Sequence, residues 1–252
     1  MKSPLLEVAA IAKSFDGVDA VRDVSLSLDD GDVVAVIGPN GAGKTTLFNL
    51  IHGEILADSG DVYFDGRSIV GLATHAIARR GIGRTFQVPA TFASMTVGES
   101  MTLVLAARAR RDGEVLSAMM PADARGKPLL ERLQIADLVD THCAALAYGD
   151  AKRVELALAL AGKPRVLLLD EPTAGMNARA RRELMQVVVD LARDDDVALL
   201  FTEHDMDIVF GFARRVVVLD RGSVIADGSP QSVRGDPRVR AAYLGDDKGQ
   251  RG

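Results

Sequence analysis

A glycine-rich run near the N-terminus is the strongest chemical signal in this 252-residue sequence. The segment Gly38-Pro-Asn-Gly-Ala-Gly-Lys-Thr45 fits the spacing G-x-x-x-x-G-K-[ST], between an apolar run and a helical pattern. Glycines let backbone N–H groups approach phosphate oxygens at a helix N-terminus, while the lysine suits the β- and γ-phosphates and the hydroxyl suits Mg²⁺. The residues expected to hold a nucleoside triphosphate are Asn40, Gly41, Ala42, Gly43, Lys44, Thr45 and Thr46, with Thr45 also a magnesium ligand. A glycine-rich turn without a ligand is the alternative, which the flanking patterns disfavour.

Two adjacent carboxylates end a second apolar run, Arg165-Val-Leu-Leu-Leu-Asp-Glu171. Adjacent residues of a strand face opposite sides, so the two carboxylates can take different roles. We expect Asp170 to hold the Mg²⁺ shell and Glu171 to act as general base toward the attacking water. A solvated acidic turn is the alternative for either carboxylate alone, and the phosphate-binding loop disfavours it.

The composition disfavours several other classes of protein. Lysine and arginine total 30 against 35 aspartates and glutamates, and the net charge of −5 offers no overall attraction to nucleic acid or anionic lipid. The single Cys143 cannot form an internal disulfide or a cysteine zinc cluster, which suits a reducing compartment. No apolar run approaches the roughly 18 residues of a membrane-spanning helix. We therefore expect a soluble chain with no nucleic-acid partner.

The motifs lie within alternating strand and helix patterns. Short β-branched runs at 33–37, 166–169 and 197–202 are each followed by a helical pattern, at 46–51, 178–191 and 206–213. This alternation is typical of βαβ units and a largely parallel sheet. Alternating runs at 6–12 and 24–28, with a strand pair at 60–69, predict a small antiparallel layer beside it.

Residues 89–150 predict an inserted helical subdomain, because β-rich runs disappear there and Ala, Leu, Met and Arg dominate. The expected breakers in it are Gly113, Pro121, Gly126 and Pro128. Its basic residues Arg108, Arg110 and Arg111 are interpreted as a solvated helix face, with a docking surface as the alternative. We expect one domain over 1–245, with its core at 1–88 and 151–227. The remainder, 228–252, is expected to hold a short helix at 237–243 and a flexible tail from 246.

At this point the sequence resembles the ATP-binding subunits of ABC transporters, whose motifs occur in order over nearly the whole chain. Phe15 stands at the position of the family's adenine-stacking aromatic residue. Gln87 resembles the Q-loop glutamine, which contacts Mg²⁺ and water and senses the membrane partner, and His204 resembles the switch histidine that contacts the γ-phosphate. The resemblance implies a RecA-like P-loop NTPase fold that binds ATP and Mg²⁺. It implies Glu171, Gln87 and His204 as the catalytic set and Asp170, Thr45 and Gln87 as the magnesium set.

Two further motifs of the family are altered here. Leu146-Ala-Tyr-Gly-Asp150 stands at the signature LSGGQ, which completes the ATP site of a second subunit, so Tyr148 and Gly149 are expected to act in trans. Ala147 replaces the signature serine and Asp150 replaces its glutamine, and the lost hydrogen bond to phosphate is worth about 1.5–3 kcal/mol. We therefore expect an asymmetric pair in which the trans site is the weaker one. Asn177 replaces the usual aspartate of the D-loop.

A closer resemblance is to the ATPases of importers for branched-chain amino acids and of relatives that handle other amino acids, amides and urea. It rests on Tyr148-Gly149, on Asn177 after Ala174-Gly175, and on the ending Ala242-Tyr-Leu-Gly245. The resemblance implies a peripheral position at the cytoplasmic face of the plasma (inner) membrane. It implies a head-to-tail pair with a second ABC ATPase subunit, two membrane permeases and, indirectly, an extracytoplasmic substrate-binding protein. The substrate meets those partners, so no residue here specifies it.

Three other functions stay open. A cytosolic ABC ATPase acting on DNA or ribosomes usually has a long coiled-coil insertion or two fused cassettes, which this sequence lacks. A P-loop kinase is disfavoured by Glu171, His204 and the signature-like segment. A nucleotide-binding regulatory module with little turnover is conceivable because of Ala147. Export rather than import also stays open.

Overall fold

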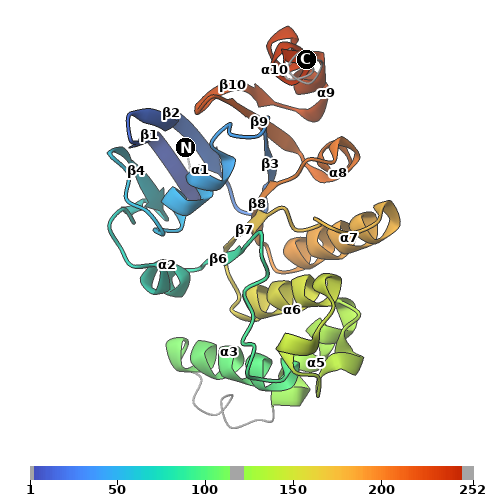
Figure 1. The fold of residues 1–252 in the computed structure, drawn as a ribbon. Coiled ribbons are helices and arrows are strands. Elements are labelled where there is room, and N and C mark those ends of the chain that lie inside the picture. Colours follow the sequence, from blue (N-terminus) through green and yellow to red (C-terminus); the bar gives the residue numbers. More distant parts are fainter. Residues whose placement is uncertain (1–2, 114–121, 246–252) are drawn as a thin grey trace.

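A six-stranded sheet forms the centre of the molecule, in the order β10-β9-β3-β8-β7-β6 (Figure 1). The computed structural model describes residues 3–113 and 122–245. Neighbouring strands from β9 through β6 are parallel, and β10 pairs antiparallel with β9. The strands are β3 Val33–Ile37, β6 Ile82–Thr85, β7 Val166–Asp170, β8 Ala198–Thr202, β9 Arg215–Asp220 and β10 Ser223–Gly228.

The central strands are covered on both faces. Every residue of β3, β7 and β8 is buried. Successive side chains of β3 alternate between two apolar clusters, with Val34 and Val36 in one and Ala35 and Ile37 in the other. A strand that is buried on both faces has a continuous run of apolar residues, and this is why the sequence predicted the boundaries of these strands well.

One face carries a second, antiparallel sheet in the order β2-β1-β4-β5 (Figure 1). Its strands are β1 Leu6–Phe15, β2 Val18–Leu28, β4 Ser59–Phe64 and β5 Arg67–Ser68. Its inward residues, including Val8 and Val62, share one apolar cluster with Phe48 of helix α1, Lys44–Ile51. Helix α2, Thr74–Arg80, contributes Ile77 to the same cluster. This arrangement confirms the antiparallel layer expected from the sequence.

Helices lie on the other side of the large sheet, some against its strands and some against neighbouring helices. They are α3 Val97–Arg111, α5 Ala122–Arg132, α6 Tyr148–Ala161, α7 Ala178–Asp194 and α8 Met206–Phe212, with 3-10 turns at Ala136–Leu138 and Cys143–Ala145. Helices α3, α5 and α6 gather at one end of the molecule (Figure 1). A reciprocal capping box starts α3, because the Thr96 side chain accepts from the Glu99 N–H and the Glu99 carboxylate accepts from the Thr96 N–H.

Two of the expected helix breakers do not break a helix. Gly126 and Pro128 lie inside α5. A Cβ atom at Gly126 would lie 2.6 Å from Cγ of Met101 on α3, so the missing side chain lets the two helices pack closely. The prediction was wrong here because glycine serves packing rather than chain reversal.

Two short helices form the C-terminal part of the described residues. Helix α9, Pro230–Gly235, begins at the Ser229 N-cap and was not expected, whereas α10, Pro237–Gly245, extends the predicted helix by two residues. The flexible tail expected from residue 246 lies outside the described residues. Over residues 3–113 and 122–245, no helix combines the length and apolar character that spanning a membrane requires. Together the parallel core, antiparallel sheet and helical region confirm the expected α/β P-loop class.

Candidate functional site

The glycine-rich loop connects β3 to α1. Gly43 is the N-cap of α1 and has a φ of 100°. A Cβ atom there would lie 2.2 Å from the Ala20 carbonyl oxygen, so neither the backbone angle nor the space admits another residue without strain. Glycine has no side-chain oxygen to cap α1, which leaves the N–H groups of the first turn for an anion.

Lys44 follows the Gly43 N-cap and is the first residue of α1. Its buried ammonium donates to the carbonyl oxygens of Gly38 (2.7 Å) and Pro39 (3.1 Å). Burial lowers the pKa of Lys44, and the negative charges of Glu171 and Asp170 oppose that shift. The cation of the loop therefore faces the two carboxylates that the sequence paired with it.

A buried hydroxyl holds the first of these carboxylates. Asp170 ends β7 and lies opposite Thr202, which ends β8. The Thr202 hydroxyl donates to Oδ1 of Asp170 (2.8 Å) and accepts a hydrogen bond from the Glu171 N–H (3.0 Å). Both side chains are buried. One threonine thus fixes the Asp170 carboxylate and the backbone of the next residue.

Glu171 leaves the strand in a left-handed backbone conformation. Its φ is 48°, so this turn, and not the strand alternation expected from the sequence, separates its side chain from that of Asp170. Glu171 Oε1 lies 2.8 Å from Nε2 of His204, and Oε2 accepts from Nε2 of Gln87 at 3.4 Å. A residue other than glycine keeps a positive φ only when its surroundings fix it, and such positions cluster at functional sites.

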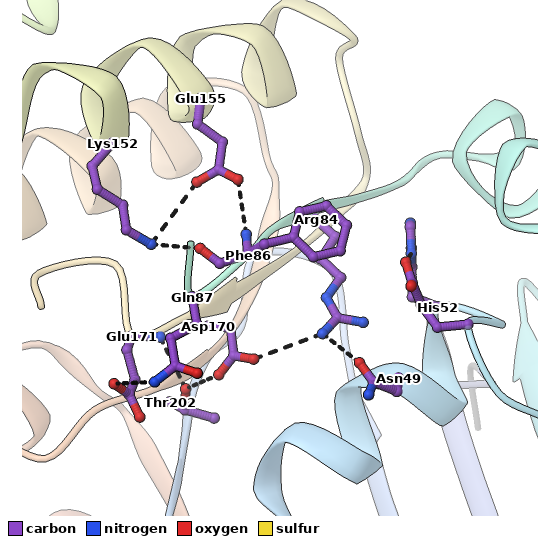
Figure 2. Close-up of polar contacts among 11 residues, drawn as sticks. Asn49, His52, Arg84, Phe86, Gln87, Lys152, Glu155, Asp170, Glu171 and Thr202 are labelled. Atoms are coloured by element: carbon purple, nitrogen blue, oxygen red, sulfur yellow. Dashed lines mark hydrogen bonds and ion pairs between the residues drawn. The ribbon is translucent and has the colours of Figure 1, made fainter. Parts of the chain in front are cut away.

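The predicted site residues meet at one edge of the large sheet. The phosphate-binding loop follows β3, and His204 follows β8. Asp170 ends β7, Glu171 follows it, and Gln87 follows β6 (Figure 2 shows these three side chains). Ligands of open parallel sheets bind outside the carboxyl ends of the strands. The structure therefore assembles these residues from four neighbouring strands into one site.

Other predicted residues lie at the borders of this site. Phe15 ends β1 with 46% of its surface exposed, and Nζ of Lys13 lies 5.5 Å from its ring centroid. Its exposed ring is compatible with base stacking, which stays a prediction. Tyr148 and Gly149 lie in the first turn of α6, where the Tyr148 hydroxyl donates to the Gln87 carbonyl oxygen (3.0 Å). Their trans contacts also stay a prediction.

The C-terminal helix α10 reaches the other side of the glycine-rich loop. Burial raises the pKa of Tyr243 to about 12, and a hydrogen bond with the Gly38 backbone opposes the shift. A cavity of about 550 Å³ lies between loop and helix, lined by residues that include Asn40, Gly41, Arg238 and Ala242. The first glycine of the loop therefore lies against Tyr243 of α10, which the sequence did not predict.

The departures from the family motifs have local structural effects. Ala147 is the N-cap of α6 and supplies no side-chain hydrogen bond, whereas Asp150 lies in the first turn, where a negative charge suits the helix dipole. Asn177 is the N-cap of α7, and its side chain accepts from the Ala180 N–H (3.0 Å). Asparagine caps a helix about as well as aspartate, so this substitution preserves the helix start.

Sequence reasoning missed a buried polar network beneath the site. Arg84 donates from Nη2 to Oδ1 of Asn49 (2.7 Å) and lies 3.7 Å from Oδ2 of Asp170 (Figure 2). Lys152 and Glu155 of α6 are buried and contact the backbone after β6. The signal that could have identified Arg84 as a buried polar residue is its position between Ile82 and Thr85 in the short strand β6. Nothing in the α6 pattern distinguishes Lys152 and Glu155 from a solvated helix face.

The donor set fits a magnesium ion that arrives with a nucleotide. The described part of the chain has no group of three or more His, Cys, Asp or Glu side chains placed to hold a metal ion. Magnesium bound beside phosphates needs only one or two protein carboxylates and keeps several waters. The Asp170 carboxylate and the exposed Thr45 hydroxyl at the start of α1 match that requirement.

Comparison with known proteins identifies the family. Residues 21–174 match the family model described as ABC transporter, and residues 223–249 match one described as Branched-chain amino acid ATP-binding cassette transporter. The chain is 36% identical over 256 residues to the high-affinity branched-chain amino acid transport ATP-binding protein BraF of Pseudomonas aeruginosa, covering 98% of this chain and 100% of BraF. It is 36% identical over 237 residues to the lipopolysaccharide export system ATP-binding protein LptB of Escherichia coli (strain K12), covering 94% and 95%.

Solved structures agree with the sequence relatives. A nucleotide-free ATP-binding cassette from an ABC transporter has a TM-score of 0.82 and 30% identity, covering 96% of this chain and 99% of that chain. The ADP conformation of an ATP-binding cassette of an ABC transporter has a TM-score of 0.81 and 31% identity, with the same coverage. The assembled nucleotide site, the fold and these matches show that the chain belongs to the ATP-binding subunits of ABC transporters, which are ATPases.

Proposed function

We propose that this ATPase drives the uptake of branched-chain amino acids or of chemically related amino acids and amides. BraF supports this substrate class, as does the branched-chain model matched by residues 223–249. The sequence identity to LptB, a subunit of an export system, is also 36%, so the direction of transport needs a separate test. The observation that carries the enzymatic part is Glu171, held between His204 and Gln87 beside the phosphate-binding loop.

The hydrolysis follows from the positions of these side chains. The loop N–H groups and Lys44 hold the phosphates and stabilise the charge that develops on them. Glu171 accepts the proton of the attacking water as general base, while His204 and Gln87 keep its carboxylate directed into the site. A magnesium ion bound with ATP supplies charge neutralisation at the phosphates, and Thr45, Asp170 and Gln87 would hold it.

An exposed apolar surface beside Gln87 supports the proposed contact with a membrane permease. Val88 and Phe92 are 76% and 42% exposed, an apolar pair next to the residue that contacts Glu171. This surface supports contact with a membrane permease, and we propose a peripheral position of the chain at the cytoplasmic face of the inner membrane. A second ABC ATPase subunit pairs head to tail and receives Tyr148 and Gly149 at its nucleotide. The substrate-binding protein acts through the permeases.

The two nucleotide sites of the pair are proposed to be unequal. The site built on Lys44 and Glu171 has its full set of side chains, whereas the trans contribution of this chain lacks a hydroxyl at Ala147. Turnover should therefore depend mainly on Glu171 of this chain. This asymmetry is refuted if Glu171→Gln leaves the ATPase rate of the assembled transporter unchanged while the equivalent substitution in the second subunit abolishes it.

Phosphate release with Mg-ATP tests the function. The assembled transporter should hydrolyse ATP faster than the isolated chain, and Glu171→Gln should slow it by about 10²–10⁴-fold without loss of ATP binding. Glu183→Gln is the matched control, because Glu183 pairs with Arg179 on the surface of α7, outside the site. Equal rates with and without permeases would contradict coupling to transport. Uptake of radiolabelled leucine or an amide into vesicles, dependent on a binding protein, would establish import over export.

A further inference from the structure

Side chains of α6 make hydrogen bonds to the backbone of the loop that carries Gln87. Among the residues that the structure describes, strand β6 pairs with β7 alone and forms the edge of the large sheet, and residues 86–90 follow it. We call residues 86–90 the Q-loop. The Glu155 carboxylate oxygen Oε1 accepts from the N–H groups of Phe86 and Ala90, each at 2.9 Å. One oxygen therefore ties together both ends of the loop.

Two more side chains of α6 complete this contact. The Lys152 ammonium donates to the Phe86 carbonyl oxygen, and the Tyr148 hydroxyl donates to the Gln87 carbonyl oxygen (3.0 Å). Tyr148, Lys152 and Glu155 are spaced by four and three residues, which places them on one face of the helix (Figure 2 shows Lys152 and Glu155). The backbone of Phe86 and Gln87 is thus fixed from α6 at three points.

The burial of Lys152 and Glu155 indicates that they do more than form an ion pair with each other. Lys152 and Glu155 are each 3% exposed, and a buried charge is unfavourable unless its hydrogen bonds are made. Nζ of Lys152 is 4.0 Å from Oε2 of Glu155, whereas both side chains make direct hydrogen bonds to the Q-loop backbone. The hydrogen bonds that these two side chains make are therefore those to the Q-loop backbone, whereas Oε2 of Glu155 has no hydrogen-bond partner in the described structure.

We infer that Tyr148, Lys152 and Glu155 are positioning residues that hold Gln87 against Glu171. Gln87 Nε2 reaches Glu171 Oε2 at 3.4 Å, near the limit for a hydrogen bond, so a small displacement of the Q-loop breaks the contact. Glu155 contributes most, because its single oxygen binds two loop N–H groups. The inference rests on the proposed role of Glu171 and Gln87 in hydrolysis, and it adds the side chains that set their geometry.

Hydrogen exchange of the intact chain tests the contact without any turnover. In Glu155→Ala, the amides of Phe86 and Ala90 should exchange at least tenfold faster than in the wild type, while the amides of β7 change less than twofold. Glu155→Gln keeps the accepting Oε1 and should retain protection within threefold. Arg153→Ala is the matched control on the same helix, because Arg153 bonds to the Leu133 carbonyl and to Gln134 instead of the Q-loop. Equal protection in Glu155→Ala and the wild type would overturn the inference.

A double-mutant cycle in the assembled transporter tests the positioning role. Glu155→Ala should lower kcat at least fivefold with the KM for ATP within twofold, and Glu155→Gln should recover most of the rate. In a Gln87→Ala background, Glu155→Ala should lower kcat less than twofold further, because the contact that it supports is already gone. A full additional loss in that background, or an equal loss in Glu155→Gln, would show general destabilisation and overturn the inference.

The two proposals fail in different ways. If wild-type transporter showed no permease-dependent hydrolysis, the proposed function would be wrong, while exchange at Phe86 and Ala90 would still decide whether α6 holds the Q-loop. If hydrolysis and its dependence on Glu171 were present, an effect of Glu155→Ala equal to that of Arg153→Ala would overturn the positioning role alone.

Tyr148→Phe removes one exposed hydroxyl and gives a variant that should fold if Glu155→Ala does not. A kcat unchanged in Tyr148→Phe would remove Tyr148 from the set.

Discussion

The Thr202 hydroxyl makes two hydrogen bonds within the site, so its removal tests how the site is held. Thr202→Val keeps the shape of the side chain but removes the hydroxyl that donates to Asp170 and accepts from the Glu171 N–H. Losing a hydrogen bond to a charged group costs about 1.5–3 kcal/mol, and a buried N–H without a partner costs about 1–3 kcal/mol. The added methyl group returns at most about 1 kcal/mol. We expect the unfolding free energy to fall by roughly 2–5 kcal/mol, out of a total of about 5–15 kcal/mol.

Urea unfolding at pH 7 measures this difference. With a slope of about 2–3 kcal/mol per molar urea, the midpoint should fall by roughly 1–2 M. Thr202→Ser is the matched control, because it keeps the hydroxyl and loses one methyl group, which costs about 1 kcal/mol. Turnover should also fall in the valine variant while it is folded, because the backbone of Glu171 loses its anchor. A valine variant as stable as the wild type, or more stable than the serine variant, would refute this account of the site.

Three further changes test other parts of the molecule. Gly43→Ala places a Cβ atom 2.2 Å from the Ala20 carbonyl oxygen and should lower stability by about 2 kcal/mol or more, read as a lower Tm, and weaken ATP binding measured by fluorescent-nucleotide titration. Burial lowers the pKa of His52 from 6.5, so the unfolded chain binds this proton more tightly than the folded chain does. The unfolding free energy of the wild type should therefore fall as the pH drops below 6.5. His52→Gln should lose less unfolding free energy than the wild type between about pH 7.5 and 5.5, measured by urea titration. Ala147→Ser supplies the missing N-cap oxygen of α6 and should add about 1 kcal/mol in calorimetry, whereas an unchanged or lower value would contradict the cap.

The sequence located the central strands and the phosphate-binding loop because their signals are local. The predicted strand at 33–37 coincides with β3, and the one at 166–169 lies within one residue of β7. Buried parallel strands are short apolar runs between turns, and the loop motif has a fixed spacing, so neither depends on distant residues. The order of the family motifs then placed Gln87 and His204, which the structure brings to Glu171.

The remainder of the site depends on contacts between distant segments. Glu155 and Phe86 are 69 positions apart, and Thr202 and Asp170 are 32 apart, so no window of sequence shows that they meet. Nothing in the α6 pattern marks Lys152 and Glu155 as buried, and their hydrogen bonds to the distant Q-loop are visible only in the structure. Strand β6 was not predicted, since its four residues include a glycine and an arginine that lack strand character. Its strand conformation comes from pairing with β7.

The contact between Tyr243 and the Gly38 backbone joins two segments that match different family models. The glycine-rich loop lies within the segment that matches the general ABC transporter model, whereas α10 lies within the segment that matches the branched-chain model. Changes in the C-terminal segment can therefore adjust the nucleotide loop of one subfamily without altering the motif that all members share. Exchanging this segment between relatives would alter how long nucleotide stays bound, even with every motif residue left intact.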